Sequence, residues 1–361
     1  MIIGIEAAHA NKPQRTGVEN YCWHVIQELK KQIPSTARVV LYSNTPLQGE
    51  LGVLPPNWEA KILRWPLEKL WSQIRLSWEL WRNPPDVFFA PGQLIPWVCP
   101  AKIVATIHDS AFLAFPSAYN FLGRIYLKWM NRLIVKKAVV ILTPSQFSKN
   151  ELKKYYKINE EKIKVTPLGY DSNVFKSLGI PREPMIMSLG RLEEKKNTIG
   201  IVKSFNILKK THPDLKLILV GAPRVGYEKI KQEIEASPYK SDIILPGWIN
   251  EQEIVGLLNK ASVFLIPSLY EGFGLPVLEA MACGAPVVAS AGNSLAEVGG
   301  GAVLYADPQN INEIAGAVDK LLADHNLREE KIKAGLERVK NFSWEKTGAN
   351  TWETISKIVN V

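Results

Sequence analysis

The sequence predicts an α/β protein built of two doubly wound, Rossmann-like domains, and three observations lead to this prediction. The chain has 361 residues, more than one ordinary hydrophobic core holds. Short β-branched runs alternate with stretches of helical periodicity, which is the βαβ rhythm of a parallel sheet. This rhythm stops once, in a segment over residues 168–184 that is interrupted by Gly179 and Pro181, and then starts again.

The predicted strands fall into two series. Those of the first series are Ile2–Glu6, Arg38–Ser43, Val87–Ala90, Ile103–His108 and Val139–Pro144. Those of the second are Met185–Leu189, Leu215–Val220, Asp242–Leu245, Ser262–Pro267 and Pro286–Ala289, with helices predicted between them, such as Lys203–Lys210 and Glu251–Leu258. We therefore expect an N-terminal domain over residues 1–170 and a C-terminal domain over residues 171–345. Ligands of open parallel sheets lie beyond the carboxyl ends of the strands, so the residues after each strand are candidate site residues.

The composition indicates a folded protein of a reducing compartment. With 46% hydrophobic and 22% charged residues the chain has no signature of disorder. The first apolar run is broken by Glu6 and follows no basic residues, which favours a strand over a signal peptide, and no run reaches the length of a membrane span. Cys22, Cys99 and Cys283 form no C-x-x-C pair, which argues against a disulfide framework or a zinc site. We expect a cytoplasmic location.

The net charge of +9 is concentrated in the first half of the chain. Residues 176–361 are neutral overall, so residues 1–175 carry the whole excess, and eight of the eleven Trp lie before residue 130. A basic and aromatic surface can meet anionic lipid, nucleic acid or an acidic acceptor. A solvated, Lys-rich exterior fits the composition equally well.

The richest segment for chemistry runs from Pro267 to Pro286 and reads as a strand, a glycine turn and a short helix over about residues 276–283. Glu271 then precedes the helix and Glu279 lies in its first turns. Gly272 and Gly274 let backbone N–H groups approach a ligand at the positive helix end. Carboxylates there can accept hydrogen bonds from sugar or ribose hydroxyls; the alternative is a capped helix with two surface glutamates. The segment lacks the third glycine of a dinucleotide-binding turn.

A second segment, Ser188–Asn197, ends a strand at Gly190 and carries a basic pair, Arg191 and Lys196. Arginine binds a diphosphate through its planar fork and lysine as a point charge. Such a pair would stabilise the charge that gathers on a departing nucleoside diphosphate. An ordinary solvated basic loop is the competing interpretation.

Both segments resemble the retaining glycosyltransferases of family 4. The resemblance is carried by the runs E-G-F-G-L-P-x-x-E-A-M-A-C-G-x-P-V-V-A-S and S-L-G-R-L-x-x-x-K-N, and it covers the whole chain. Further similar segments, in order, are Thr16–Tyr21, Ile107–Ser110, Leu168–Phe175 and Phe342–Glu345. The resemblance implies a GT-B fold, with two Rossmann-like domains facing across a cleft. The N-terminal domain would bind the acceptor and the C-terminal domain the nucleotide sugar, and a C-terminal helix over residues 346–361 would return to the N-terminal domain.

The resemblance also implies a role for each matching position. The residues expected to act in catalysis are His108, which would face the anomeric region, Arg191 and Lys196, which would grip the diphosphate, and Glu271, which would hold the sugar hydroxyls. The residues expected to bind the donor are Gly17 near the phosphates, Gly190, the base-pocket residues Gly247, Trp248 and Ile249, the amides of Gly272, Phe273, Gly274 and Leu275, and Glu279 at the ribose. Thr16 and Glu19 stand where relatives often carry further glycine.

The resemblance implies a hexosyltransferase that retains the anomeric configuration, with a nucleoside-diphosphate sugar as substrate and no cofactor. No D-x-D triplet occurs, so no metal is expected on the diphosphate. The His108 segment, with Phe112, Phe115 and Pro116, is similar to the mannosyltransferase branch, which favours mannose from GDP-mannose; a UDP-sugar carrying glucose or N-acetylhexosamine is the alternative. The acceptor would be a saccharide or lipid-linked saccharide of cell-surface glycan synthesis.

Three other functions compete with this one. They are a sugar-nucleotide epimerase, a phosphorylase-like enzyme with pyridoxal phosphate, and a catalytically silent membrane-associated subunit. The paired glutamates Glu271 and Glu279 fit the transferase better than the epimerase. The chain is short for a phosphorylase, and intact candidate site residues argue against a silent subunit.

A predicted helix over residues 119–137 motivates a membrane contact. Arg124, Lys128, Arg132 and Lys136 recur every four residues and form one basic ridge, whereas Leu122, Tyr126, Trp129 and Leu133 gather on another face and should dock the helix on its domain. We expect a peripheral contact with the anionic inner face of the membrane and no nucleic-acid partner. A second helical stripe, formed by Leu67, Trp71, Ile74, Trp78 and Trp81, is predicted to be a buried core face.

Overall fold

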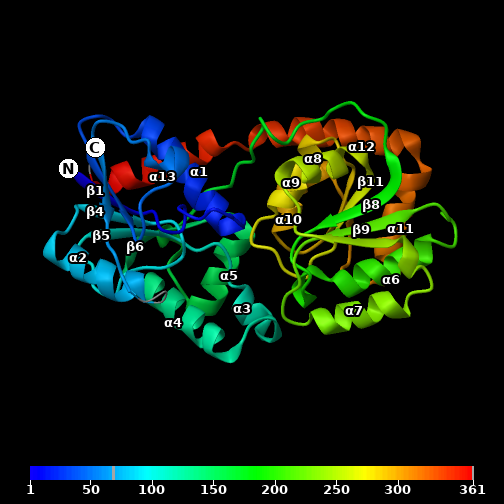
Figure 1. The fold of residues 1–361 in the computed structure, drawn as a ribbon, viewed down its shortest axis with the longest axis horizontal. Coiled ribbons are helices and arrows are strands. Elements are labelled where there is room, and N and C mark those ends of the chain that lie inside the picture. The colour runs from blue at the N-terminus through cyan, green and yellow to red at the C-terminus, as the bar shows by residue number, and fades with distance from the viewer. Residues whose placement is uncertain (67–69, 360–361) are drawn as a thin grey trace. The chain divides into compact units, whose positions relative to one another are not determined.

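The computed structural model describes residues 1–66 and 70–359 and divides into two compact units. The first unit comprises residues 1–110, 122–169 and 344–361, and the second comprises residues 111–121 and 170–343. The sequence did not separate residues 111–121 from the first domain. Each unit is an α/β sandwich around one parallel sheet (Figure 1).

The first unit contains a seven-stranded sheet in the order β3-β2-β1-β4-β5-β6-β7, and every neighbouring pair is parallel. Its strands are β1 (Ile2–Glu6), β2 (Arg38–Ser43), β3 (Trp58–Ile62), β4 (Val87–Ala90), β5 (Lys102–Thr106), β6 (Ala138–Thr143) and β7 (Ile163–Val165). The strand order reverses direction between β1 and β4, which makes that pair the switch point where doubly wound sheets bind ligands.

Helices cover both faces of this sheet (Figure 1). They are α1 (Gly17–Gln32), the π-helical turn η2 (Trp71–Leu76), α2 (Ser77–Arg82), α4 (Phe121–Lys137), α5 (Gln146–Tyr156) and α13 (Trp344–Val359). Leu80 of α2, Met130 of α4 and Leu152 of α5 belong to one buried cluster, so these three helices share a face. Helices α1 and α13 pack together on the other face.

The C-terminal helix α13 belongs to the first unit, as the resemblance implied. The hydroxyl of Thr347 donates to the carbonyl oxygen of Pro167 at 2.8 Å, and Lys164 forms an ion pair with Glu353 at 3.0 Å. The Lys102 ammonium donates to the carbonyl oxygen of Ile358. The chain therefore completes its first unit with its last helix.

The second unit contains a six-stranded parallel sheet in the order β10-β9-β8-β11-β12-β13, with its switch point between β8 and β11. Its strands are β8 (Glu183–Leu189), β9 (Lys216–Val220), β10 (Ile243–Gly247), β11 (Ala261–Ile266), β12 (Val287–Ser290) and β13 (Leu304–Ala306). Its helices are α3 (Ala111–Ala114), α6 (Thr198–Leu208), α7 (Tyr227–Ala236), α8 (Glu251–Lys260), α9 (Leu275–Ala282), α10 (Ser294–Gly299), α11 (Ile311–Ala323) and α12 (His325–Arg338).

Short 3₁₀ turns join several of these elements. They are η1 (Gly49–Gly52), η3 (Pro116–Ala118), η4 (Glu160–Lys162), η5 (Glu194–Lys196), η6 (Lys240–Asp242), η7 (Gly300–Ala302) and η8 (Val339–Asn341). The apolar sides of α6, α7 and α11 form one cluster with the strands of the second sheet, and α8, α9, α10 and α12 lie on its other side (Figure 1).

Two predictions about burial were wrong. In the predicted Trp stripe only Trp71 is buried, whereas Ile74, Trp78 and Trp81 are exposed, and Leu67 lies outside the described residues. The reason is local: the π-helical turn over Trp71–Leu76 changes the number of residues per turn, so the side chains after it no longer continue the same face.

The second error concerns the docking face of α4. Met130 and Ile134 are the residues buried against the sheet, whereas Leu122 and Trp129 of the predicted docking face are exposed. Tyr126 and Leu133 pack at the edge of the core. Apolar residues occur on nearly every face of α4, so its periodicity did not identify the buried one.

Candidate active site

The switch point of the second sheet brings together most of the predicted donor residues. Gly190, Arg191 and Lys196 follow β8, and Glu271 follows β11, the strand beside it in the sheet. Gly190, Arg191 and Lys196 line one narrow cavity with Ser268. Residues that are far apart in the sequence, such as Lys196 and Glu271, which lie 75 positions apart, thus meet at one sheet edge.

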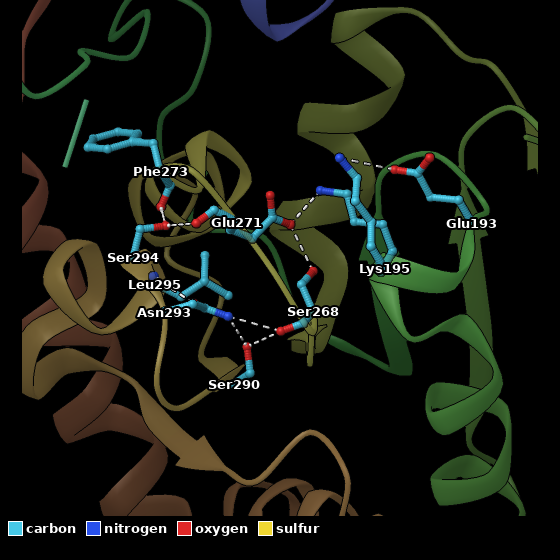
Figure 2. A network of polar contacts seen from close by, with 10 residues as sticks. Glu193, Lys195, Ser268, Glu271, Phe273, Ser290, Asn293, Ser294 and Leu295 are labelled. Atoms are coloured by element: carbon cyan, nitrogen blue, oxygen red, sulfur yellow. Dashed lines mark hydrogen bonds and ion pairs between the residues drawn. The ribbon is translucent and has the colours of Figure 1, made fainter. Parts of the chain in front are cut away.

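Glu271 and Lys196 are bonded directly to each other. The Lys196 ammonium donates to Oε1 of Glu271, and the Ser268 hydroxyl donates to the same oxygen at 2.8 Å (Figure 2). Burial opposes ionisation of Glu271, but the charges of Lys196 and Lys195 and these hydrogen bonds outweigh burial and hold its pKa below the ordinary value. Glu271 is therefore a carboxylate at neutral pH and accepts hydrogen bonds only.

A buried polar network holds the loop that carries Glu271 (Figure 2). The Ser294 hydroxyl lies 2.7 Å from the carbonyl oxygen of Glu271 and 2.9 Å from that of Phe273. The Ser290 hydroxyl and the Asn293 amide donate to the carbonyl oxygen of Ser268 at 2.6 and 3.0 Å. Ser290, Asn293 and Ser294 were not among the predicted site residues, although all three follow the predicted strand Pro286–Ala289 within five residues and so lie near a sheet edge.

Gly274 shapes the start of helix α9. Its φ of 114° is left-handed, and a Cβ at this position would lie 2.3 Å from Cδ2 of Leu295, so only glycine fits. Pro276 occupies the first turn, and the helix ends at Ala282, within one residue of the prediction. Gly272 and Leu275, on either side of this turn, are partly exposed, whereas the side chain of Phe273 is buried and packs against Phe342.

Glu279 is the carboxyl group in this region without a partner. The described part of the chain provides no hydrogen bond or ion pair to its side chain, which is only partly exposed. Burial and the charge of Glu251 raise its pKa to about 7. A carboxyl group held in this way without a partner is a sign of a ligand site.

The remaining predicted donor residues of the second unit lie at the same edge of its sheet. Arg191 is exposed and has no partner among the described residues. Gly247 ends β10 with a φ of 77°, and the indole of Trp248 after it is 67% exposed. Ile249 is partly buried. An exposed indole at a strand end can stack on a flat ring.

Gly17 begins helix α1 in the first unit, after the ten-residue loop over residues 7–16 that follows β1. A Cβ added there would meet nothing within 4 Å, so the space beside the helix start is open. The N–H and hydroxyl of Thr16 both donate to the Glu19 carboxylate. Thr16 and Glu19 therefore cap the helix.

His108 follows β5 and is buried. Its Nε2 lies 2.9 Å from the carbonyl oxygen of Pro91, which can only accept, so Nε2 carries the proton and Nδ1 presents a lone pair. Tyr21 meets the imidazole edge-on, with ring centroids 4.7 Å apart. Burial lowers the pKa of His108, so the ring is neutral at physiological pH.

The predicted basic ridge lies on α4. Lys128, Arg132 and Lys136 are exposed and form no ion pair within the described residues, and Arg124 is partly exposed. The same part of the chain contains no gathering of three His, Cys, Asp or Glu side chains that could bind a metal. Among residues 1–66 and 70–359, no helix has the length and apolar character that crossing a bilayer requires.

Two protein-family models match the chain. The model of glycosyl transferases group 1 matches residues 171–338, and that of glycosyltransferase family 4 matches residues 15–174. O-antigen chain mannosyltransferase B of Escherichia coli is 30% identical over 295 residues, which are 77% of this chain and 76% of that protein. The serotype-specific mannosyltransferase WbdA of Escherichia coli is 26% identical over 290 residues, which are 74% of this chain and 34% of WbdA.

The fold has solved counterparts. HepE from Anabaena, in complex with UDP and glucose, matches with a TM-score of 0.76 and 18% identity over 99% of this chain and 100% of HepE. This likeness shows a shared fold. Together, the two doubly wound units, the family matches and the relative at 30% identity show that the chain belongs to the glycosyltransferases of family 4, enzymes with the GT-B fold that use nucleotide sugars.

Proposed function

We propose that this protein transfers a hexose from a nucleoside-diphosphate sugar to a saccharide or lipid-linked saccharide, with retention of the anomeric configuration and without a metal ion. The observation that carries the proposal is the edge of the second sheet. It combines an unpaired arginine, a lysine–glutamate pair and an unpartnered carboxyl group at one switch point. In a nucleoside-diphosphate sugar the diphosphate would bind the cations, and the hydroxyls of the sugar ring and of the ribose would donate hydrogen bonds to the two carboxyl groups.

Arg191 and Lys196 would stabilise the departing diphosphate. Bond cleavage leaves negative charge on the phosphate oxygens, and two fixed cations stabilise that charge more in the transition state than in the ground state. The sequence offers no D-x-D pair to hold a metal on the diphosphate, so these cations would replace it. The freed phosphate oxygen would take the proton of the attacking acceptor hydroxyl.

Glu271 and Glu279 would bind different parts of the donor. Glu271 is ionised and fixed by Ser268 and Lys196, so its second oxygen would accept a hydrogen bond from a sugar hydroxyl. Glu279 would accept hydrogen bonds from the ribose hydroxyls, which would be the hydrogen-bond partners that its side chain lacks in the described residues. The open space beside Gly17 would admit phosphate oxygens to the start of α1, and Nδ1 of His108 would accept a hydrogen bond from the sugar.

Mannose from GDP-mannose is the proposed donor. Its support is the similarity to O-antigen chain mannosyltransferase B and WbdA. A UDP-sugar is the second candidate, because the matching structure of HepE contains UDP and glucose.

A thermal-shift panel of GDP-mannose, UDP-glucose and UDP-N-acetylglucosamine would test the donor. A ligand at about 100 times its dissociation constant stabilises the folded state by about 2.7 kcal/mol. We expect GDP-mannose to raise the melting temperature most, and Glu279→Ala to reduce the rise. A larger rise with a UDP-sugar would replace GDP-mannose by that donor, and no rise with any of them would contradict the proposal.

We also propose that the first unit attaches to anionic membranes through one aromatic and basic surface. On α4 this surface consists of the basic ridge with the exposed side chains of Leu122, Ile125 and Trp129. Trp97 lies edge-on to Trp129 with centroids 5.8 Å apart. The N–H of Val98, the next residue, donates to Ser77, the first residue of α2.

The exposed Trp78 and Trp81 extend the surface along α2. Cations beside indoles that face solvent are the combination that interfacial anchors use. Each basic residue near anionic lipid contributes about 1 kcal/mol at low salt. The wrong prediction of a buried Trp stripe therefore adds to this proposal, because the indoles are available to lipid.

Co-sedimentation with phosphatidylglycerol-containing vesicles at low and high salt would test the attachment. Replacing all four ridge residues by Gln should abolish binding at low salt. The matched control replaces four exposed lysines of the second unit by Gln, namely Lys210, Lys216, Lys229 and Lys231, and should retain binding. If both variants lost vesicle binding equally, the attraction would come from the net charge of the protein and not from this surface. Binding by the ridge variant at low salt would contradict the proposed surface.

A further inference from the structure

The main-chain hydrogen bonds of strand β5 with its neighbours stop one residue before His108. The N–H of Ile107 still donates to the carbonyl oxygen of Leu142 on β6, at 2.9 Å. The ladders that join β5 to β4 and to β6 end before His108. Because buried main-chain groups need hydrogen-bond partners, those of His108 and Asp109 require partners from outside the sheet.

The side-chain amide of Gln93 supplies two of these bonds. Its oxygen accepts the N–H of His108 at 3.1 Å, and its nitrogen donates to the carbonyl oxygen of Asp109 at 3.3 Å. The amide thus takes the place of a peptide group in a neighbouring strand. Its nitrogen also donates to Oδ1 of Asn131, a buried residue of α4, at 3.0 Å. Since an N–H only donates and a carbonyl oxygen only accepts, the two main-chain partners fix the orientation of the amide.

Gln93 makes these bonds from an unfavourable backbone conformation. It lies in the turn after β4, and its φ of 61° falls in the left-handed region, which residues other than glycine rarely adopt. Such a conformation costs free energy and persists only where other interactions hold it. A glycine would adopt this turn more easily, but it has no amide side chain to bond the end of β5.

The same turn also holds the imidazole of His108. The carbonyl oxygen of Pro91, two residues before Gln93, accepts the proton of Nε2 at 2.9 Å. Ser148 of α5 donates to the carbonyl oxygen of His108 at 3.3 Å. Among the residues that the structure describes, partners are thus provided for the N–H, the carbonyl oxygen and Nε2 of His108, and none for Nδ1.

These contacts determine which nitrogen of the ring carries the proton. A neutral imidazole has one N–H and one lone pair, so a proton held on Nε2 leaves Nδ1 as an acceptor. If the turn moved away from the end of β5, the carbonyl oxygen of Pro91 would no longer favour the proton on Nε2. The proton would then also occupy Nδ1, and a nitrogen that carries a proton cannot accept a hydrogen bond.

We propose that Gln93 is a positioning residue for His108: its amide fixes the turn after β4 to the end of β5, so that Nε2 keeps the ring proton and Nδ1 accepts a hydrogen bond from a hydroxyl of the donor sugar. This inference rests on the proposed function, which gives His108 its contact with the sugar. It also restricts the ligand, because the group that meets Nδ1 must donate a hydrogen bond. A sugar hydroxyl donates, whereas an ionised phosphate oxygen does not.

Nitrogen-15 NMR of the histidine rings measures the position of the proton directly, in a chain with five histidines. A ring nitrogen that carries a proton resonates far from one that carries a lone pair. The signals of His108 are assigned by their loss in His108→Gln. In the wild type without ligand we expect one tautomer, with the proton on Nε2, and in Gln93→Gly a mixture of both tautomers.

The choice of variants separates the amide from the backbone. Gln93→Gly removes the amide and relieves the left-handed turn, so the variant should fold, whereas Gln93→Leu removes the amide but keeps a side chain of similar size. Both should give the mixture of tautomers. The matched control is Lys157→Gly, because Lys157 is also left-handed, with a φ of 51°, and follows α5 in the same unit with an exposed side chain. The control should leave the His108 signals unchanged.

A ratio of affinities separates positioning from a general loss of structure. Calorimetry would compare GDP-mannose with GDP, and UDP-glucose with UDP. Only the intact donor carries a sugar for His108, so Gln93→Gly should bind the donor about three- to tenfold more weakly, the scale of one hydrogen bond, and bind the nucleoside diphosphate as the wild type does. A misfolded fraction would lower the number of binding sites in both titrations and leave this ratio unchanged.

The outcomes distinguish this role from the proposed function. If the proton of wild-type His108 is not on Nε2, or if either Gln93 variant keeps the wild-type ring signals, the role of Gln93 is overturned even when nucleotide sugars bind. Equal weakening of donor and nucleoside diphosphate overturns it as well, because the amide would then support the site in general. If no nucleotide sugar binds the wild type, the proposed function fails, and with it the contact of His108 with the sugar.

Discussion

Glu279 gives the sharpest prediction, because its ionisation falls within the working pH range. Burial and Glu251 place its pKa at about 7 in the free protein, and only the carboxylate accepts hydrogen bonds from both ribose hydroxyls. Between about pH 8 and about pH 6 the ionised fraction falls from about nine tenths to about one tenth. Affinity scales with the competent fraction, so the apparent dissociation constant for the donor should rise about tenfold.

Isothermal titration calorimetry with an intact nucleotide sugar would measure this change. The intact donor is used because its diphosphate, esterified at both ends, has no proton to lose in this range. Glu279→Gln should bind more weakly at high pH and lose the pH dependence. A tenfold change that persists in Glu279→Gln, or no change in wild type, would refute the assignment of Glu279 to the ribose.

The same group predicts a stability change with a fixed sign. The folded-state pKa of about 7 lies above the ordinary value of 4.5, so burial of Glu279 costs nothing below about pH 4.5. The cost grows as the pH rises and is complete above about pH 7, at about 3 kcal/mol. Glu279→Gln should therefore raise the free energy of unfolding at high pH, measured by denaturant titration without ligand, and the gain should vanish toward about pH 5.

Four other predictions concern the donor site. Arg191→Ala and Lys196→Ala should each lower kcat/KM about 30- to 150-fold, which is about 2 to 3 kcal/mol of lost bonding to a charged group; wild-type turnover by either folded variant would contradict the diphosphate assignment. Lys196→Ala should also lower the free energy of unfolding by about 1 to 3 kcal/mol, because the buried carboxylate of Glu271 loses the ammonium bonded to it. Arg191→Ala should leave this free energy unchanged, because Arg191 is exposed and has no partner in the described part of the chain. Gly17→Ala should leave the free energy of unfolding unchanged or slightly raised, because the added Cβ would meet no other atom within 4 Å. If phosphates approach the start of the helix, the same variant should bind the donor at least tenfold more weakly. Unaltered binding would show that Gly17 is not part of the donor site. EDTA should leave the transfer rate intact, and loss that Mg²⁺ or Mn²⁺ restores would overturn the metal-independent proposal.

The interior of each sheet could be predicted because its strands are continuous apolar runs. Strands β1, β2 and β4 begin and end where the sequence indicated. Three strands were missed, namely β3, β7 and β13, which lie at sheet edges. An edge strand such as Trp58–Ile62 needs apolar residues on one side only, and the other two span three residues each.

The candidate site could be predicted only in part. Strand ends and glycine turns located Gly190 and Gly274, and family resemblance named the charged residues beside them. The pairing of Lys196 with Glu271 depends on β8 and β11 being neighbours, which no local pattern reveals.

Transfer of radiolabelled mannose from GDP-α-mannose, followed by NMR of the anomeric proton in the product, tests the central claim most directly. We predict a mannosylated product with the α configuration in the presence of EDTA, with one GDP released for each mannose transferred. We also predict that Lys196→Ala gives about a hundredth of that product under the same conditions. A β-linked product would contradict retention, and no transfer of a hexose from GDP-mannose or any UDP-sugar to an acceptor would contradict the proposed function itself.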